Sequence, residues 1–234
     1  VFDAFRPELD LSAFEFFTDR ALDHVCRANG LSAPFETSCP LYVVTEFDCG
    51  DEEAEDRAMA CFQACSEQGW LLDGVISQSD RQVAELWRYR EGISESISHF
   101  PPYKNDLSVR ISAVPEFLRR MDDLMRQLCP DFEVVWYGHI GDGNLHLNLL
   151  KPAHMELSQF EARAQEISEK TYAVTQQAGG SISAEHGIGL LKQPWLDRSR
   201  SKAEIEYLAS IKKAFDPAGI LNPGKLLPTG INRG

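Results

Sequence analysis

The stretch YGHIGDGNLHLN, residues 137–148, decides the fold because it predicts a β-hairpin that carries two histidines. An Asp-Gly pair between two apolar stretches is a strong short-range signal for a tight turn, since glycine tolerates positive φ. Folding the chain about Asp142-Gly143 places His139 directly opposite His146, and opposed residues have Cβ atoms roughly 4.5–5.5 Å apart. The two imidazoles are therefore expected on one face, close enough to share an ion.

The alternation of side chains along a strand gives this hairpin two different faces. It puts Tyr137 and Asn148 beside the histidines. The opposite face is apolar and is expected to join the core: Trp136, Ile140, Leu145, Leu147 and Leu149. The sequence thus predicts one face for the core and one face for chemistry.

A third donor is needed for a metal site, because two histidines alone hold a catalytic divalent ion poorly. The glycine-flanked segment SAEHGIG, residues 183–189, offers Glu185 followed by His186. A His-His-Glu set with an open position suits Zn²⁺, or a similar ion, acting as a Lewis acid. His186 would then be free to act as a general base. The alternative is that His139 and His146 are ordinary cross-strand residues with a structural role.

The rest of the chain shows helical and strand patterns without long linkers. Helices are expected at residues 11–30, 52–69, 80–98, 114–128, 157–180 and 202–215. Strands are expected at residues 41–47, 74–79, 106–112, 134–140 and 145–150, while residues 181–189 begin as a strand and continue as a loop. Hairpinned strands beside helices favour an α+β fold, with helices on one face of a largely antiparallel sheet.

The charge of the chain limits its partners. The 234 residues include 23 basic and 36 acidic ones, and the formal charge of -13 argues against nucleic acid and anionic membranes. An anionic substrate would need cationic groups gathered locally. The sequence has no apolar run long enough to span a membrane. Its six scattered cysteines are typical of reduced thiols in a cytoplasmic protein.

Three motifs in order resemble the C-terminal domain of the FAD-linked oxidases: GHIGDGNLHLN (138–148), SAEHGIGLLK (183–192) and FDPAGILNPGK (215–225). Within the vanillyl-alcohol oxidase superfamily, they are most similar to the D-2-hydroxyglutarate and D-lactate dehydrogenase branch. The resemblance implies a ferredoxin-like domain that caps the flavin, while a separate domain binds FAD. No feature of that FAD-binding domain is recognisable in this sequence, so the resemblance implies a C-terminal half.

The same resemblance divides the chain into two parts. Residues 1–200 would form the substrate-binding cap. Because the chain starts at Val1, inside what resembles the cap, we expect the first strands of the cap to be missing. Residues 201–234 would form a C-terminal helix and a tail that pack on the missing FAD-binding domain.

The resemblance also implies a role for each candidate residue. WRYREGISES (87–96) and YKNDLS (103–108) resemble substrate-binding segments, and NPGK (222–225) resembles a signature that reaches the flavin. Ser94 stands where the family often has threonine. The implied roles are metal binding for His139, His146 and Glu185, proton transfer for His186, substrate binding for Arg90, Ser94, Lys104 and Asn148, and flavin contact for Asn222 and Lys225.

Elementary chemistry agrees with a carboxylate site at Arg90. Arg90 and Ser94 are four residues apart on an expected helix and so share a face. The planar fork of arginine fits a carboxylate, which lysine matches only as a point charge. Together with Lys104, Arg90 would supply the local positive charge that an anionic substrate needs. The alternative is that both cations are solvated surface residues.

The function expected from these observations is oxidation of a small D-2-hydroxy acid to its 2-oxo acid by an FAD-dependent dehydrogenase. The substrate would be of the D-2-hydroxyglutarate or D-lactate type. A divalent ion, Zn²⁺ before Mn²⁺ or Co²⁺, would bind the hydroxyl, His186 would take its proton, and the C2 hydride would pass to the flavin. Electrons would then leave for an acceptor that this half does not specify. This half alone is expected to lack FAD and activity.

Two alternatives stay open. One is a stand-alone metallohydrolase that uses the same His-His-Glu ion and an activated water. The other is a non-catalytic module that binds a metal or another ligand.

Overall fold

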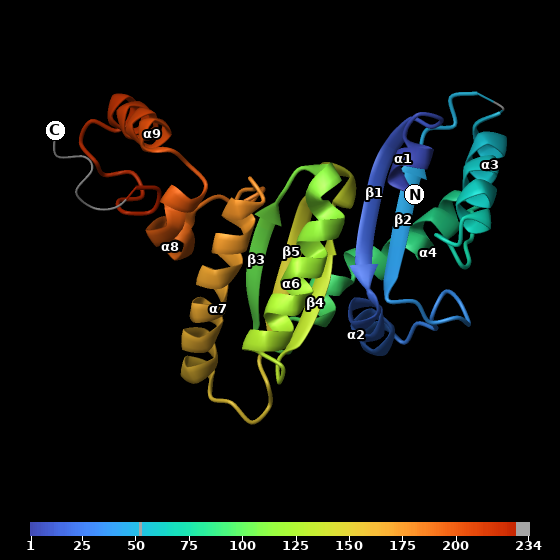
Figure 1. Ribbon diagram of the computed structural model, residues 1–234, viewed down its shortest axis with the longest axis horizontal. Helices are drawn as coiled ribbons and strands as arrows, with labels where there is room; N and C mark the ends of the chain where they lie inside the picture. The colour runs from blue at the N-terminus through green and yellow to red at the C-terminus, as the bar shows by residue number, and fades with distance from the viewer. Residues whose placement is uncertain (52, 228–234) are drawn as a thin grey trace.

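The computed structural model describes residues 1–51 and 53–227. Its centre is a five-stranded antiparallel sheet with the order β2-β1-β4-β5-β3 (Figure 1). The strands are β1 (Leu11–Thr18), β2 (Leu41–Phe47), β3 (Pro102–Ser108), β4 (Glu133–Gly138) and β5 (Asn144–Leu150). The α+β class and the antiparallel sheet expected from the sequence are confirmed.

Helices connect and flank these strands. They are α1 (Phe2–Phe5), α2 (Asp19–Asn29), α3 (Ala54–Glu67), α4 (Asp80–Glu91), α5 (Ile93–Ser96), α6 (Val114–Leu128), α7 (Leu157–Gln177), α8 (Gly189–Lys192) and α9 (Lys202–Phe215). Short 3-10 helices are η1 (Ile111–Ala113), η2 (Ile140–Asp142) and η3 (Gln193–Arg198). The helices α6 and α9 have the bounds that the sequence predicts. Within the described ranges, no helix is long and apolar enough to cross a membrane.

The second half of the sheet has the ferredoxin-like order. The elements β3, α6, β4, β5 and α7 follow one another, and β5 lies between β3 and β4. The chain then returns to β3, where Ser181 forms a single bridge with Ser108 in place of the expected strand. This β-α-β-β-α-β arrangement is the ferredoxin-like topology, as the family resemblance implies.

The helices α6 and α7 cover one face of the sheet. The buried side chains between them and the strands include Leu107, Phe117, Met121, Trp136, Leu145, Leu147, Leu149, Phe160 and Ile167. Ile140 packs against the same cluster. The apolar face predicted for the hairpin is therefore the face that joins the main core.

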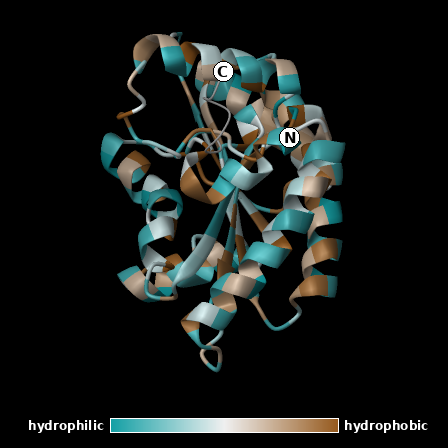
Figure 2. Ribbon diagram, turned by 90° about the vertical axis from the view of Figure 1, so that its left-hand side faces the viewer, coloured by the Kyte–Doolittle hydropathy of each residue, from teal (hydrophilic) through white to brown (hydrophobic). Residues whose placement is uncertain are grey.

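The opposite face is covered by other helices, chiefly over β1 and β4. Val25 of α2 packs with Ile93 and Ile97, at α5, against Phe17 and Val135 of these strands. Figure 2 shows helices on both sides of the strands. The expectation of helices on one face is therefore right for α6 and α7 but wrong for the sheet as a whole. Polar side chains of β5 and β3 occupy the rest of this second face.

The segment 11–30 is a strand followed by a helix, not the single helix expected from its apolar spacing. Phe14, Glu15, Phe16 and Phe17 are all buried because both faces of β1 are covered. Because these consecutive residues are all apolar or buried, β1 lacks the alternation of apolar and polar side chains that normally marks a strand.

Two smaller expectations also differ from the structure. Residues 74–79 form no strand, and Val75 is 60% exposed with no sheet to pack against. The strand expected at 106–112 lies at Pro102–Ser108 instead. Proline is tolerated as the first residue of an edge strand, so Pro102 can begin β3.

The elements after α7 lie beside it, at one end of the molecule (Figure 1). The helix α9 has no buried residue. Large apolar side chains are exposed in this region: Leu190, Leu191, Tyr207, Ile211, Phe215, Ile220 and Leu221. Residues 189–227 thus leave apolar surface uncovered.

A glycine fixes the connection between β4 and β5 and provides a test of the fold. Gly143 has a φ of 73°, and a Cβ there would lie 2.0 Å from the carbonyl oxygen of Val109. We expect Gly143→Ala to lower the free energy of unfolding by about 2–5 kcal/mol, from left-handed strain together with overpacking. Urea unfolding followed by circular dichroism measures this loss.

Gly187→Ala is the matched control, since Gly187 has the same φ of 73° but no heavy atom within 4 Å of its Cβ position. It should lose only the strain of a left-handed residue, about 1–2 kcal/mol. Equal losses in the two variants would show that the contact with Val109 does not constrain the hairpin.

Candidate metal and substrate site

The two histidines of the hairpin are not directly opposed, which corrects the predicted register. Tyr137 pairs with His146, and His139 lies beyond the end of β4. The connection is longer than a two-residue turn, because the carbonyl of His139 accepts N–H bonds from Asp142 (3.0 Å) and Asn144 (3.1 Å) around η2. The register shifts by two residues, and a shift of two keeps each side chain on its predicted face.

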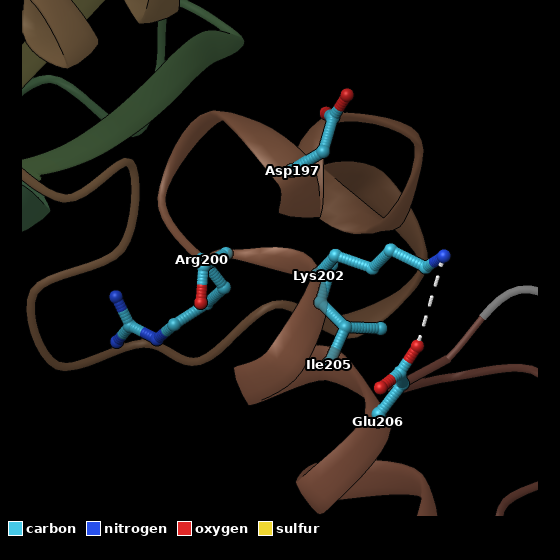
Figure 3. A pocket seen from close by; sticks show the side chains of 6 residues that line it. Asp197, Arg200, Lys202, Ile205 and Glu206 are labelled. Carbon is cyan, nitrogen blue, oxygen red and sulfur yellow. Dashed lines mark ion pairs between the residues drawn. The ribbon is translucent and has the colours of Figure 1, made fainter.

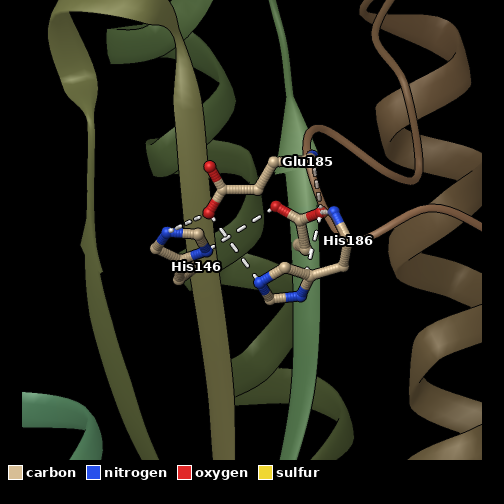
Figure 4. A group of neighbouring side chains, drawn as sticks. His146, Glu185 and His186 are labelled. Carbon is tan, nitrogen blue, oxygen red and sulfur yellow. Dashed lines mark hydrogen bonds and ion pairs between the residues drawn. The ribbon is translucent and has the colours of Figure 1, made fainter.

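The imidazoles nevertheless meet on that face. The ring centroids of His139 and His146 are 5.5 Å apart. Glu185 reaches both rings from the loop after α7: its Oε1 lies 3.9 Å from Nε2 of His139 and 3.5 Å from Nε2 of His146. His186 stacks on His146 with ring centroids 5.7 Å apart (Figure 4). The structure thus brings together all three predicted metal ligands and the predicted base.

Two buried carboxylates that the sequence reasoning missed lie on the other side of these rings. Glu15 of β1 is 5% exposed, and its Oε1 is 2.8 Å from Nδ1 of His139. Asp106 of β3 is 1% exposed, and its Oδ1 is 3.6 Å from Nδ1 of His146. A signal existed for Glu15: it is a single charge in the aromatic stretch FEFF, and buried charges require partners.

Asp106 also holds the loop that carries Glu185 and His186. Its Oδ2 accepts the backbone N–H of Glu185 (2.9 Å) and of His186 (2.8 Å). The buried Lys192 lies 3.9 Å from the same oxygen. Burial alone would raise the pKa of Asp106, but the two N–H groups and the charge of Lys192 outweigh it and hold that pKa below its usual value. Asp106 is therefore an ionised anchor for this loop.

The distances from Glu185 Oε1 to the two imidazoles are compatible with a divalent ion shared by the carboxylate and either ring. Ligands of a tetrahedral zinc site, with bonds of about 2.0–2.2 Å, lie about 3.3–3.5 Å apart, close to the separations of Glu185 Oε1 from the two Nε2 atoms. Burial lowers the pKa of His146 to about 4, so its imidazole is neutral at pH 7 and can bind a metal.

The group of donors that lie close together among the described residues differs from the predicted ligand set, because it contains Asp106 and His186 beside His146 and Glu185 and does not contain His139. Asp106 and His186 offer ligand atoms within 4.8 Å of those of His146 and Glu185. Asp106, however, faces Nδ1 of His146, whereas Glu185 faces Nε2. An ion on the Nε2 side of this ring would therefore be shared with Glu185 rather than with Asp106.

A small cavity of about 110 Å³ adjoins the histidines. The residues that line it are Ser94, Lys104, Asn105, Tyr137, His146, Asn148 and His186. Lys104 Nζ donates to Ser94 Oγ at 3.1 Å. Asn148 is 1% exposed, and its Oδ1 has no hydrogen-bond partner among the described residues. Three of the four predicted substrate residues thus surround one space beside the candidate metal ligands.

Arg90, the fourth predicted substrate residue, does not line this cavity. It is 8% exposed, its Nη2 forms an ion pair with Glu15 Oε2 at 2.9 Å, and its guanidinium lies 4.9 Å from the ring centroid of Tyr137. The alternative that Arg90 is a solvated surface charge is therefore wrong. Its partner in this structure is a buried carboxylate of the chain.

A larger hollow of about 460 Å³ lies where α9 begins (Figure 3). It is lined by Asp197, Arg200, Ser201, Lys202, Ile205 and Glu206. Its ion pair joins Lys202 to Glu206 at 3.9 Å, and both side chains are largely exposed. Nothing among these residues resembles a catalytic set, so the chemistry is better placed at the histidines.

The two residues expected to reach the flavin lie on the surface of the tail after α9. Asn222 and Lys225 are exposed, and Asn222 has a φ of 45°. Gln193 ties this tail down, because its Nε2 donates to the carbonyls of Gly224 and Leu227, each at 2.6 Å. The described part of the tail, up to Leu227, is therefore held against η3.

Comparisons with known proteins identify the family and agree with this fold. Residues 2–226 match the family described as FAD linked oxidases, C-terminal domain. The D-2-hydroxyglutarate dehydrogenase of Stutzerimonas stutzeri is 52% identical over 226 residues, which are 97% of this chain and 49% of that protein. The protein of the same name from Xanthomonas citri pv. viticola is 56% identical over 229 residues, or 98% and 48% of the two chains. The chain thus spans about half the length of these curated relatives.

A solved structure shares the fold. The 4-ethylphenol oxidase from Gulosibacter chungangensis, in its isoeugenol complex, superposes with a TM-score of 0.61 at 15% identity, over 97% of this chain and 51% of that one. The family match covers nearly the whole chain. The chain therefore belongs to the family of FAD-linked oxidase C-terminal domains.

Proposed function

We propose that this chain is the substrate-binding C-terminal half of an FAD-dependent dehydrogenase that oxidises a D-2-hydroxy acid to its 2-oxo acid. The names of the two bacterial relatives favour D-2-hydroxyglutarate over D-lactate as the substrate. The observation that carries the proposal is the convergence of His139, His146 and Glu185 beside a cavity lined by Lys104 and His186. We also propose a cytoplasmic location, which the scattered cysteines favour.

In this proposal the metal site consists of His139, His146 and Glu185. A divalent ion there, with Zn²⁺ favoured and Mn²⁺ or Co²⁺ as alternatives, would lower the pKa of a bound substrate hydroxyl. Glu185 Oε1 lies 3.9 Å from Nε2 of His139 and 3.5 Å from Nε2 of His146, whereas Asp106 lies on the Nδ1 side of His146. This orientation supports Glu185 rather than Asp106 as the third ligand.

The other residues of the cavity would bind the substrate and move its proton. The ammonium of Lys104 would bind the carboxylate, with the hydroxyl of Ser94 beside it. The unpartnered Oδ1 of Asn148 would accept a hydrogen bond from the substrate. The imidazole of His186 would take the hydroxyl proton, and FAD in the other half would supply the hydride acceptor.

The surface of residues 201–234 would face the FAD-binding half, with Asn222 and Lys225 directed to the flavin. The support is the exposed apolar surface of α9 and the tail, which includes Tyr207, Ile211 and Phe215, in a chain that spans about half of its relatives. Residues 228–234 of this part lie outside the described residues. Family membership favours this proposal over a stand-alone metallohydrolase or a non-catalytic module.

A chimera tests the proposed activity. This chain would replace the corresponding half of the Stutzerimonas relative, and FAD content and D-2-hydroxyglutarate oxidation would be measured. We expect a yellow, active chimera. Lys104→Ala in it should lower kcat/KM by an amount equal to about 1.5–3 kcal/mol, because a charged hydrogen bond to the carboxylate is lost.

Lys170→Ala is the control for this series, since Lys170 is exposed and lies in α7, which covers the opposite face of the sheet from the cavity. It should leave kcat/KM unchanged. An FAD-loaded chimera that does not oxidise D-2-hydroxyglutarate, or that tolerates Lys104→Ala, would contradict the proposed substrate site.

Arg90 has two competing roles that stability measurements can separate. It could bind a substrate carboxylate only by leaving Glu15, because that carboxylate holds Nη2 in the structure. Removing it as Arg90→Met leaves Glu15 buried without its cation, and we expect a loss of about 3–5 kcal/mol in the free energy of unfolding. The double variant Glu15→Gln, Arg90→Met should lose less. If Arg90→Met alone unfolds with the same free energy as the parent chain, the ion pair with Glu15 does not stabilise the fold, and substrate binding is the role that is left for Arg90.

A further inference from the structure

The two candidate histidine ligands share one arrangement of partners. Each ring has a buried carboxylate on its Nδ1 side and the shared carboxylate of Glu185 on its Nε2 side. For His139 the distances are 2.8 Å to Glu15 and 3.9 Å to Glu185. For His146 they are 3.6 Å to Asp106 and 3.5 Å to Glu185. Both histidines therefore lie between a buried carboxylate and Glu185. The buried carboxylate is Glu15 of β1 for His139 and Asp106 of β3 for His146.

Each buried carboxylate is fixed by partners of its own. Glu15 has Arg90 on Oε2, which leaves Oε1 for His139. Asp106 has two backbone N–H groups on Oδ2, which leaves Oδ1 for His146. This Oδ1 is buried and has no hydrogen-bond partner within the described residues. In each carboxylate, the oxygen that faces Nδ1 of the histidine has no other partner among the described residues.

We propose that Glu15 and Asp106 are positioning residues that hold His139 and His146 with the proton on Nδ1 and the lone pair of Nε2 directed at a shared metal ion. This inference rests on the metal site of the proposed function. A metal-binding histidine needs an acceptor for its second N–H, which fixes the tautomer and the orientation of the ring. Neither carboxylate would bind the ion itself.

Replacement of either carboxylate by its amide puts an NH₂ donor opposite another N–H donor. In Glu15→Gln the side chain meets the donor Arg90 on one side and the N–H of His139 on the other, so its NH₂ group must face one of them. In Asp106→Asn the same conflict arises between His146 and the loop N–H groups. Size and shape are kept in both variants, whereas the negative charge and one of the two acceptor oxygens are lost.

The test is titration of the purified chain with Zn²⁺ and with Co²⁺, whose absorption spectrum reports its ligands. We expect Glu15→Gln and Asp106→Asn each to weaken metal affinity by about 10–100-fold. Glu133→Gln is the matched control: Glu133 Oε1 lies 2.9 Å from Nε2 of His24, a carboxylate-histidine pair away from the cluster. That variant should bind metal as the parent does, and thermal unfolding of every variant is followed in parallel.

A second measurement needs no variant. Nitrogen-15 NMR of the metal-free chain distinguishes the two neutral tautomers of each histidine, and we expect the Nδ1–H form for both His139 and His146. Glu15→Gln should shift His139 toward the Nε2–H form and leave His146 unchanged. A change in stability alone would not move these signals.

The outcomes separate the two proposals. If the parent chain binds neither ion, the proposed metal site is wrong and the inference falls with it. If the parent binds metal and both variants bind it equally well, the metal site stands and the positioning role is overturned. Nε2–H tautomers in the metal-free parent would also overturn it.

Discussion

Glu15 and Asp106 are buried carboxylates, and the need to pair them constrains everything around the candidate site. An unpaired buried charge costs several kcal/mol, so each must be surrounded by donors. Glu15 of β1 forms an ion pair with Arg90 of α4 and contacts His139 of the hairpin. Asp106 draws the loop that carries Glu185 to β3 through its backbone N–H groups. Segments far apart in sequence therefore meet at one place on the sheet because two charges lie inside it.

The sheet supplies the rigidity that this arrangement needs. β3 and β5 pair side by side, so Asp106 lies opposite His146 and Lys104 lies opposite Asn148. Alternation directs these four side chains away from the face that α6 and α7 cover. The apolar face anchors the strands in the main core, while the polar face presents donors at fixed spacing. Glu185 and His186 come from a loop that Asp106 fixes, and His139 comes from the connection that follows β4.

The sequence predicted the class of the fold and the faces of the hairpin, and it named His139, His146, Glu185 and His186, which the structure brings together, because these features depend on local period and on motifs. It did not predict the register, since the Asp-Gly signal does not distinguish a two-residue turn from a longer one that also ends in a left-handed glycine. It mistook β1 for part of a helix, because a strand buried on both faces has no alternation. Missing β1 also hid Glu15, and with it the ion pair that occupies Arg90.

Anomalous X-ray diffraction at the zinc edge, from crystals of the chain grown with Zn²⁺, tests the central claim most directly, namely that both imidazoles present Nε2 to one shared ion. The account predicts one peak at about 2.0–2.2 Å from His139 Nε2, His146 Nε2 and a carboxylate oxygen of Glu185. Ordered crystals with no peak there, or with a peak bound through Nδ1 of His146 and Asp106, would contradict it.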